Sequence, residues 1–258
     1  MGVRALERIE QLILADTIDA VWGLHVEFMA EFGFDRLFYG LSYEAGVTDF
    51  VSLDDMMILS NHPQSYLNWF LNEGHFRNSP GLEWSRSNIG ACLWEELYSP
   101  LTDLSDEERA VVARNRKLGI TAGVTISLGA TPPCGRSLIG LTACPGTKQS
   151  EVNAIWKEHG RTILLLNQVA HLKIVTLPRT NLERKLTPRQ RSVLKLVGAG
   201  KTAPEIACIM GVSTVTVEKH LRLAREELGV ETSAQALLKA AVQAQIFLPE
   251  REKSLSER

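Results

Sequence analysis

The sequence has few cysteines and no long apolar run, and each absence excludes a class of protein. Its four cysteines, Cys92, Cys134, Cys144 and Cys208, form no CxxC pair, which argues against a zinc site. Met1–Glu10 mixes charged and apolar residues, so we expect no secretory signal, and we predict reduced thiols in the cytoplasm. No apolar run approaches the ~20 residues that a membrane span needs, so no membrane partner is expected.

Motifs typical of catalysis or of a bound cofactor are also absent. The sequence contains no GxSxG, no HExxH and no glycine-rich phosphate loop. Its six histidines show no metal-ligand spacing such as HxH or HxxxH. We therefore predict that the protein is not an enzyme and holds neither a cofactor nor a metal.

A net charge near zero argues at first against a nucleic-acid partner. The 258 residues carry 28 Lys and Arg against 30 Asp and Glu, a net charge of -2. Residues 1–180 hold 15 basic and 21 acidic side chains, a net charge of -6, whereas residues 181–258 hold 13 basic and 9 acidic ones, a net charge of +4. A change of sign along the chain indicates two domains, of which the second is basic.

The first part of the chain mixes helical and strand patterns. An apolar stripe at helical spacing runs from Leu6 to Phe28, and a second one runs from a Ser150 cap to Leu172. Short strands are predicted at Leu37–Leu41, Val124–Leu128 and Leu138–Thr142.

A capping box marks a further helix in this part. Ser105 and Glu108 can each satisfy a free backbone N–H at the start of a helix that Gly119 ends. Helices that interleave with blocks of strands predict an α+β fold, in which an α-β-α sandwich binds a ligand over residues 1–175.

A second domain follows a polar linker at 176–185. Capping boxes at Thr187–Gln190 and Thr202–Glu205 begin two helices, and the turn Gly211–Ser213 leads into a third helix capped by Ser213. A fourth helix is predicted at about Ser233–Gln243. Two helices joined by a short glycine turn predict a helix-turn-helix in an all-α four-helix domain over 186–249, with a charged disordered tail at 250–258.

The third helix of this domain is the predicted recognition helix. Hydroxyl side chains near its start suit base edges, and its basic side chains suit phosphates or guanine. A small helical bundle with a solvated charged face is the alternative, and the consecutive capping signals in a basic domain disfavour it. The predicted DNA-binding residues are Thr202, Ser213, Thr214, Thr216, Glu218, Lys219, Arg222 and Arg225.

This domain resembles a known family of DNA-binding domains. The run LTPRQRSVLKLVGAGKTAPEIACIMGVSTVTVEKHLRLAREELGV, Leu186–Val230, is similar to that of LuxR-type regulators, with Leu194 and Gly200 at hallmark positions. Gln190 replaces the usual Glu and still closes the capping box, whereas Glu218 replaces the usual Lys and removes a phosphate contact. The resemblance implies a homodimer on an inverted-repeat, double-stranded operator.

The preceding domain is similar to the autoinducer-binding domain of the same family. The segments FDRLFYGLS, HPQSYLNWFLNEGHFRNSP, LWEEL and LGITAGVTISL occur in the family's order and spacing. A phospho-receiver is disfavoured, because the chain opens with an amphipathic helix rather than a buried strand. Family positions are matched by Pro63, Pro80, Trp94, Gly119 and Gly123.

The residues that hold an acyl-homoserine lactone in that family differ here. Tyr66 stands for the lactone-binding Trp, Phe70 for a Tyr, Ser79 for the Asp, and His62 for a Tyr at the acyl carbonyl. Losing a charged hydrogen bond in a dry pocket costs roughly 1.5–3 kcal/mol, tenfold or more in affinity. The pocket is thus predicted to prefer another small-molecule signal, bound by His62, Tyr66, Phe70, Ser79, Trp94, Phe38, Gly40 and Ser137.

Each pocket residue also has a purely structural explanation. The aromatics Tyr66, Trp69 and Phe70 suit a core, Ser79 suits a turn before Pro80, and His62 suits a surface position. The pattern as a whole favours a DNA-binding transcriptional regulator controlled by a small signalling molecule, related to quorum sensing. The alternative is a ligand-independent LuxR-type regulator whose first domain serves dimerisation only.

Overall fold

The computed structural model describes residues 3–42, 56–99, 103–130, 135–177, 186–242 and 245–247. The chain forms two compact units, Met1–Val175 and Thr176–Arg258, which we treat separately. Residues 178–185 of the predicted linker, and the predicted tail, lie outside the described residues. Over the described ranges, no helix has both the length and the apolar content to cross a membrane.

A five-stranded antiparallel sheet forms the middle of the first unit, in the order β2-β1-β5-β4-β3. The three predicted strand segments fall within β1, β4 and β5, whereas β2 and β3 are short edge strands without an alternating pattern. The strands are β1 (Phe34–Ser42), β2 (Met56–Ser60), β3 (Gly90–Leu93), β4 (Gly123–Ala130) and β5 (Arg136–Ala143).

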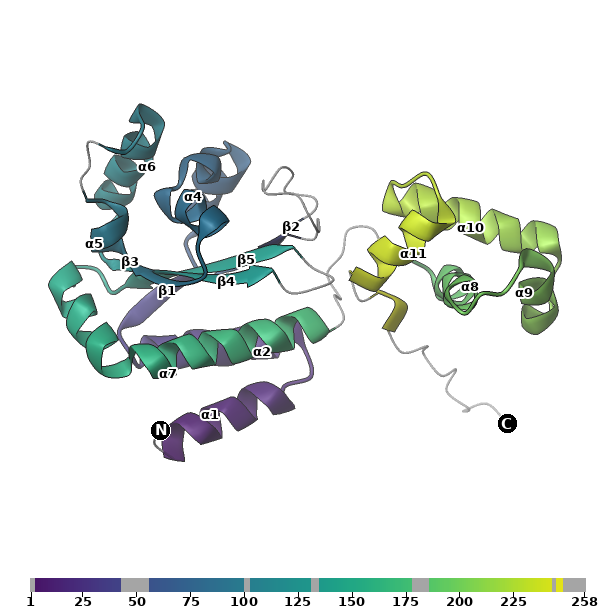
Figure 1. The fold of residues 1–258 in the computed structure, drawn as a ribbon, viewed down its shortest axis with the longest axis horizontal. Helices are drawn as coiled ribbons and strands as arrows, with labels where there is room; N and C mark the ends of the chain where they lie inside the picture. The colour runs from purple at the N-terminus through teal and green to yellow at the C-terminus, as the bar shows by residue number, and fades with distance from the viewer. Residues whose placement is uncertain are drawn as a thin grey trace. The chain divides into compact units, whose positions relative to one another are not determined.

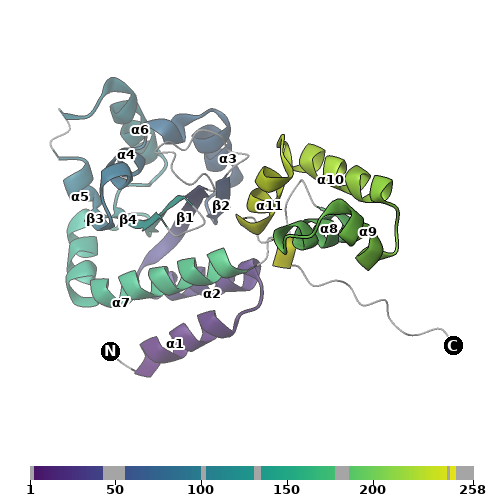
Figure 2. The same ribbon diagram turned by 45° about the vertical axis from the view of Figure 1, so that its right-hand side comes forward.

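Helices cover both faces of this sheet, which confirms the predicted α-β-α sandwich (Figures 1 and 2). One face carries α2 (Ile18–Ala30) and α7 (Gln149–Thr176), with α1 (Val3–Leu14) packed outside them. The other face carries α3 (Gln64–Leu67), a π-helical turn (Asn68–Asn72), a 3-10 turn (His75–Asn78), α4 (Pro80–Ser87), α5 (Trp94–Leu97) and α6 (Asp106–Lys117).

The helix boundaries correct two predictions. The stripe from Leu6 to Phe28 is two helices, because the Thr17 side chain accepts a hydrogen bond from the Ala20 N–H and starts α2 anew. Ser150 is not the cap of α7, since the helix begins one residue earlier and the Glu151 carboxylate accepts from the Lys148 N–H instead. The Ser105–Glu108 capping box of α6 is confirmed.

Buried polar side chains connect the sheet to α7 and α7 to α2. The Tyr39 hydroxyl on β1 lies 2.9 Å from His171 Nδ1 on α7, and His25 Nε2 on α2 lies 3.0 Å from Asn167 Oδ1 on α7. Each bond gives a buried side chain a partner in a low-dielectric interior. They fix how the helix layer sits on this face of the sheet.

The second unit contains the four predicted helices. They are α8 (Pro188–Gly198), α9 (Ala203–Met210), α10 (Thr214–Leu228) and α11 (Ser233–Val242), followed by a 3-10 turn at Gln245–Phe247. Thr187 and Gln190 form the expected capping box, and Gly211 adopts φ +64° in the turn before α10. The core of this unit includes Val193, Leu194, Ile206, Val217, Leu221, Ala224 and Leu228.

Gly123 generates a stability prediction. A Cβ at this position would collide with the Leu141 carbonyl oxygen and lie 2.9 Å from a ring carbon of Trp94. Overpacking of this kind typically costs about 1–3 kcal/mol, so Gly123→Ala should lower the free energy of unfolding by that amount in urea. Gly140→Ala is the control, because a Cβ there meets no atom within 4 Å. Equal stability of the two variants would contradict the prediction.

Candidate functional site

A cavity lies between the sheet and the helices α3 to α6. The sheet contributes alternate residues, because every second side chain of a strand points to the same face. This wall consists of Phe38, Gly40, Met56, Thr125, Leu138, Gly140 and Thr142. The helical wall includes His62, Tyr66, Phe70, Phe76, Ser79, Trp94, Tyr98, Asn115 and Ile120.

The described lining of this cavity is uncharged. It consists of apolar and aromatic side chains with a few neutral hydroxyl, amide and imidazole groups. The cavity leaves about 70 Å³ of space for the centre of a water-sized sphere. An apolar cavity with a few inward polar groups is typical of a small-molecule site.

Stacked rings form one side of the cavity. The Tyr66 ring stacks on the His62 ring at 4.6 Å with an interplanar angle of 28° and on the Phe70 ring at 5.3 Å with an angle of 15°. Phe38 on β1 meets Phe70 edge-on at 5.4 Å. Offset stacks and edge-on contacts are the favourable arrangements of aromatic rings, so the wall is held in place without a ligand.

Trp94 is anchored to the sheet at the far end of this wall. Its indole Nε1 donates a hydrogen bond of 3.0 Å to Thr125 Oγ1 on β4. The same hydroxyl packs against Gly81 of α4, where a Cβ would come within 2.8 Å of it. Trp94 is thus part of the cavity wall and has its N–H already satisfied.

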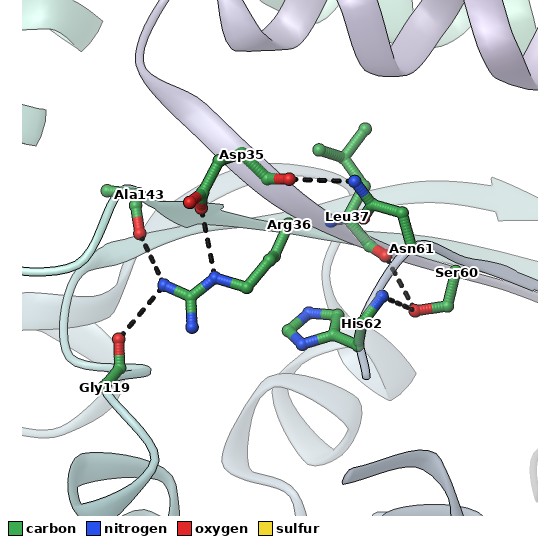
Figure 3. Close-up of polar contacts among 8 residues, drawn as sticks. All are labelled: Asp35, Arg36, Leu37, Ser60, Asn61, His62, Gly119 and Ala143. Atoms are coloured by element: carbon green, nitrogen blue, oxygen red, sulfur yellow. Dashed lines mark hydrogen bonds and ion pairs between the residues drawn. The ribbon is translucent and has the colours of Figure 1, made fainter. Parts of the chain in front are cut away.

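Arg36 connects three segments beside the cavity (Figure 3). Its guanidinium donates to the carbonyl oxygens of Gly119 at 3.1 Å and Ala143 at 2.9 Å and pairs with Asp35 at 3.0 Å. Because Gly119 directly precedes the lining residue Ile120, Arg36 holds that part of the cavity wall against β1 and β5.

His62 extends from the end of β2 toward this guanidinium (Figure 3). Its backbone N–H donates to Ser60 Oγ at 3.1 Å, and its side chain is buried, with 7% exposed. Burial and, to a lesser extent, the positive charge of Arg36 lower the pKa of His62 to about 4. The imidazole is therefore neutral at pH 7 and offers one N–H and one lone pair.

The structure brings together all but one of the predicted pocket residues. Phe38, Gly40, His62, Tyr66, Phe70, Ser79 and Trp94 line the cavity. Ser137 does not, because it lies on the other face of the sheet, where its hydroxyl donates to the Gly129 carbonyl at 3.3 Å and faces His171.

Other residues that line the cavity were not predicted from the sequence. Leu138, Gly140 and Thr142 follow from the alternation of β5 once the phase is known. Asn115 lies in the last turn of α6, and no motif marks it. Its Oδ1 atom is buried and, within the described part of the chain, has no hydrogen-bond partner.

The candidate DNA-binding surface lies on α10. Thr214, Glu218, Lys219 and Arg222 are exposed on it, whereas Val217 and Leu221 face the core. The Ser213 side chain accepts from the Thr216 N–H at 3.2 Å and caps the helix, as predicted. Exposed hydroxyl and basic side chains at the start of a second helix fit the recognition helix of a helix-turn-helix.

Three residues on or near this surface have contacts or an exposure that the sequence did not predict. Arg225 is half-buried and donates to Ser233 Oγ at 3.1 Å, so it also holds α11. Thr202 donates through its N–H and its hydroxyl to the Glu205 carboxylate, in the capping box of α9. Val215, which is not among the predicted residues, is 80% exposed and is an additional candidate for contact with a base methyl group.

A cavity-bearing α-β-α unit and a helix-turn-helix unit in one chain are the architecture of a ligand-binding transcriptional regulator. The family profile of the autoinducer binding domain matches residues 17–174, more than half of the chain. The profile of sigma-70, region 4 matches residues 183–228. The chain belongs to the autoinducer-binding family of LuxR-type transcriptional regulators.

Two transcriptional regulators are similar over most of this chain. An HTH-type transcriptional regulator of Sinorhizobium fredii, y4qH, is 27% identical over 220 residues, which cover 83% of this chain and 64% of that protein. This chain therefore spans just under two thirds of that relative's length. The transcriptional activator CarR of Pectobacterium carotovorum is 23% identical over 193 residues, 71% of this chain and 77% of CarR.

Solved structures of SdiA share the fold. Escherichia coli SdiA has a TM-score of 0.51 at 18% identity and covers 94% of this chain and 98% of its own. SdiA in complex with octanoyl-rac-glycerol has a TM-score of 0.55 at 17% identity, with 94% and 95% covered. These likenesses support the architecture of both units.

The neutral buried histidines generate a prediction on pH. Burial lowers the pKa of His25 and His171 to about 4, as it does for His62. Protonation therefore favours the unfolded chain, so stability that is present above pH 6.5 is lost as the pH falls toward 4.

At pH 5 this effect is about 2 kcal/mol for each such histidine. His62→Phe keeps the ring stacked on Tyr66 and removes one titrating group. Its free energy of unfolding in urea should fall about 2 kcal/mol less than that of the wild type between pH 7 and pH 5. An equal fall in both proteins would show that His62 does not titrate in this way.

Proposed function

We propose that this chain is a transcriptional regulator whose binding to DNA is controlled by a small uncharged molecule held in the cavity of the first unit. The observation that carries the proposal is the uncharged, aromatic-lined cavity with unpaired polar atoms, in the domain that matches the autoinducer-binding profile. The helix-turn-helix of the second unit supplies the means to bind DNA.

The signal differs from an ordinary acyl-homoserine lactone. Tyr66, Phe70 and Ser79 line the cavity at the positions where the resemblance expects the lactone-holding groups. No described lining residue is a carboxylate that accepts the amide N–H of such a ligand. An acyl-homoserine lactone should therefore bind about tenfold or more weakly than to a pocket that has the carboxylate.

A homodimer on an inverted repeat is the form that we propose binds DNA. Two recognition helices about one turn of DNA apart, ~34–36 Å, read such a site together. A net charge of +4 on residues 181–258 is a modest attraction for phosphate, so one unit alone binds weakly. Leu172 on α7 and Leu238 on α11 are exposed apolar side chains that suit contacts between two copies.

Ligand binding couples to DNA binding through the stability of the first unit. A molecule that binds only the folded unit stabilises it by mass action and raises the population able to dimerise. A dimer of the first unit then carries two DNA-binding units, 186–249, one for each half-site.

The direct test compares protein purified from cells with the same protein stripped of bound small molecules. Restoring an organic extract of the cells should raise the Tm of the first unit and change the Kd for an operator selected from random DNA. The alternative function, a ligand-independent regulator, predicts the same Tm and Kd with and without the extract.

Two exposed basic residues on α10 provide the test of the DNA-binding surface. Lys219→Ala and Arg222→Ala should each weaken operator binding and reduce the slope of log K against log salt by about 1 for every phosphate that the variant no longer binds. Lys195→Ala removes the same charge from an exposed position on α8 and is the matched control. Unchanged slopes for Lys219→Ala and Arg222→Ala would refute binding of phosphate by these two side chains.

A further inference from the structure

We propose that His62 and Asn115 together select the ligand, and that this ligand is an uncharged, largely apolar molecule whose head group carries two hydroxyl groups. The inference rests on the proposed function, because it names the ligand class of the same cavity. It assigns a role to Asn115, for which the sequence gives no signal.

Two buried polar atoms in the cavity wall have no partner within the described part of the chain. They are His62 Nδ1 and Asn115 Oδ1, and both residues line the cavity. More than nine tenths of the His62 surface is buried. Buried polar atoms are nearly always hydrogen-bonded, since an unpaired one has lost its water without compensation. Because both residues line the cavity, a molecule bound there is the partner that we assign to each atom.

Both groups are held in place by contacts that do not involve a ligand. The His62 ring stacks on Tyr66 at 4.6 Å, and its backbone N–H is bonded to Ser60. The backbone carbonyl oxygen of Asn115 accepts from the N–H groups of Leu118 at 3.0 Å and Ile120 at 2.9 Å, which fixes the end of α6 from which this side chain projects. Groups that are ordered before binding lose little entropy when the ligand arrives.

The chemistry of the two atoms defines the head group. Asn115 Oδ1 only accepts, so its partner must donate an O–H or N–H. The neutral imidazole of His62 carries one N–H and one lone pair, and a hydroxyl can satisfy either. A carboxylate or an ammonium group is disfavoured, because no described lining residue offers the opposite charge.

The size of the cavity agrees with a small head group. About 70 Å³ is open to the centre of a water-sized sphere, which is more than the space that a single water needs. The aromatic wall of Phe38, Tyr66 and Phe70 packs against the apolar part of the ligand.

Three probes with the same acyl chain test the head group on the stripped full-length protein. Octanoyl glycerol has two hydroxyl groups, octanoyl-homoserine lactone has one amide N–H, and methyl octanoate has no donor. Calorimetry should give the tightest Kd for the glycerol ester and the weakest for the methyl ester. Each hydrogen bond that a probe cannot make should cost about tenfold in affinity.

Variants of the two residues separate ligand selection from folding. Asn115→Leu and His62→Phe should each weaken octanoyl glycerol about tenfold or more, while the Tm of the empty protein at pH 7 stays equal or rises, because an unpaired polar atom is removed. Asn72→Leu and His75→Phe are the matched controls and should bind as the wild type does. Asn72 is exposed and bonded to Asn68, and His75 stacks on Trp69 at 4.8 Å, outside the cavity lining.

The outcomes distinguish this inference from the proposed function. Octanoyl glycerol that binds no more tightly than methyl octanoate, or a cavity variant that keeps the wild-type Kd, overturns the inference. Failure of all three probes also overturns it, and the proposed function stands if operator binding still responds to the cell extract. Loss of that response overturns the proposed function itself.

Discussion

Trp94 can lie against the sheet only because residue 123 has no side chain. A Cβ on Gly123 would collide with the backbone of β5 and with the indole ring, and a Cβ on Gly81 would press on the Thr125 hydroxyl that accepts the indole N–H. These two glycines set how closely the helices approach β4. The cavity is the space that remains beside this contact, where Gly140 presents no side chain.

The described residues that line the cavity are uncharged, and the charged Arg36 lies beside them. The side chain of His62 extends toward the guanidinium of Arg36. This guanidinium is bound to Asp35 and to two carbonyl oxygens, so it already has hydrogen-bond partners without a ligand. Its positive charge adds to burial in keeping His62 neutral. A site built in this way accepts a neutral molecule and rejects an ion, since an ion would lose its hydration without gaining a counter-charge. The acidic character of the first unit thus belongs to its surface.

Sequence patterns predicted the features that depend on near neighbours along the chain. The capping boxes at Ser105 and Thr187 join residues three positions apart, so their residue types suffice to place α6 and α8. The resemblance of the segment around Tyr66 to the family's domain placed most of the pocket residues. Both predictions need no knowledge of the tertiary structure.

The sequence did not predict features that depend on which face of a strand or helix points inward, or on how two elements pack. Helices cover both faces of β5, so its burial does not reveal which face Ser137 occupies, and a register shift opposite it between Ser127 and Gly129 changes the phase locally. Asn115 lines the cavity because α6 packs over the sheet. No local sequence pattern predicts this packing. Val215 belongs to an apolar run but lies off the stripe that Val217 and Leu221 define, and it is exposed for that reason.

Native mass spectrometry of the full-length chain, purified directly from cells in which it binds its operator, tests whether the cavity of the first unit holds a neutral small molecule in the working protein. We expect a discrete mass above that of the chain, released on unfolding as a neutral molecule with two hydroxyl groups. A protein that binds its operator fully and shows only the mass of the bare chain would rule out a bound signal.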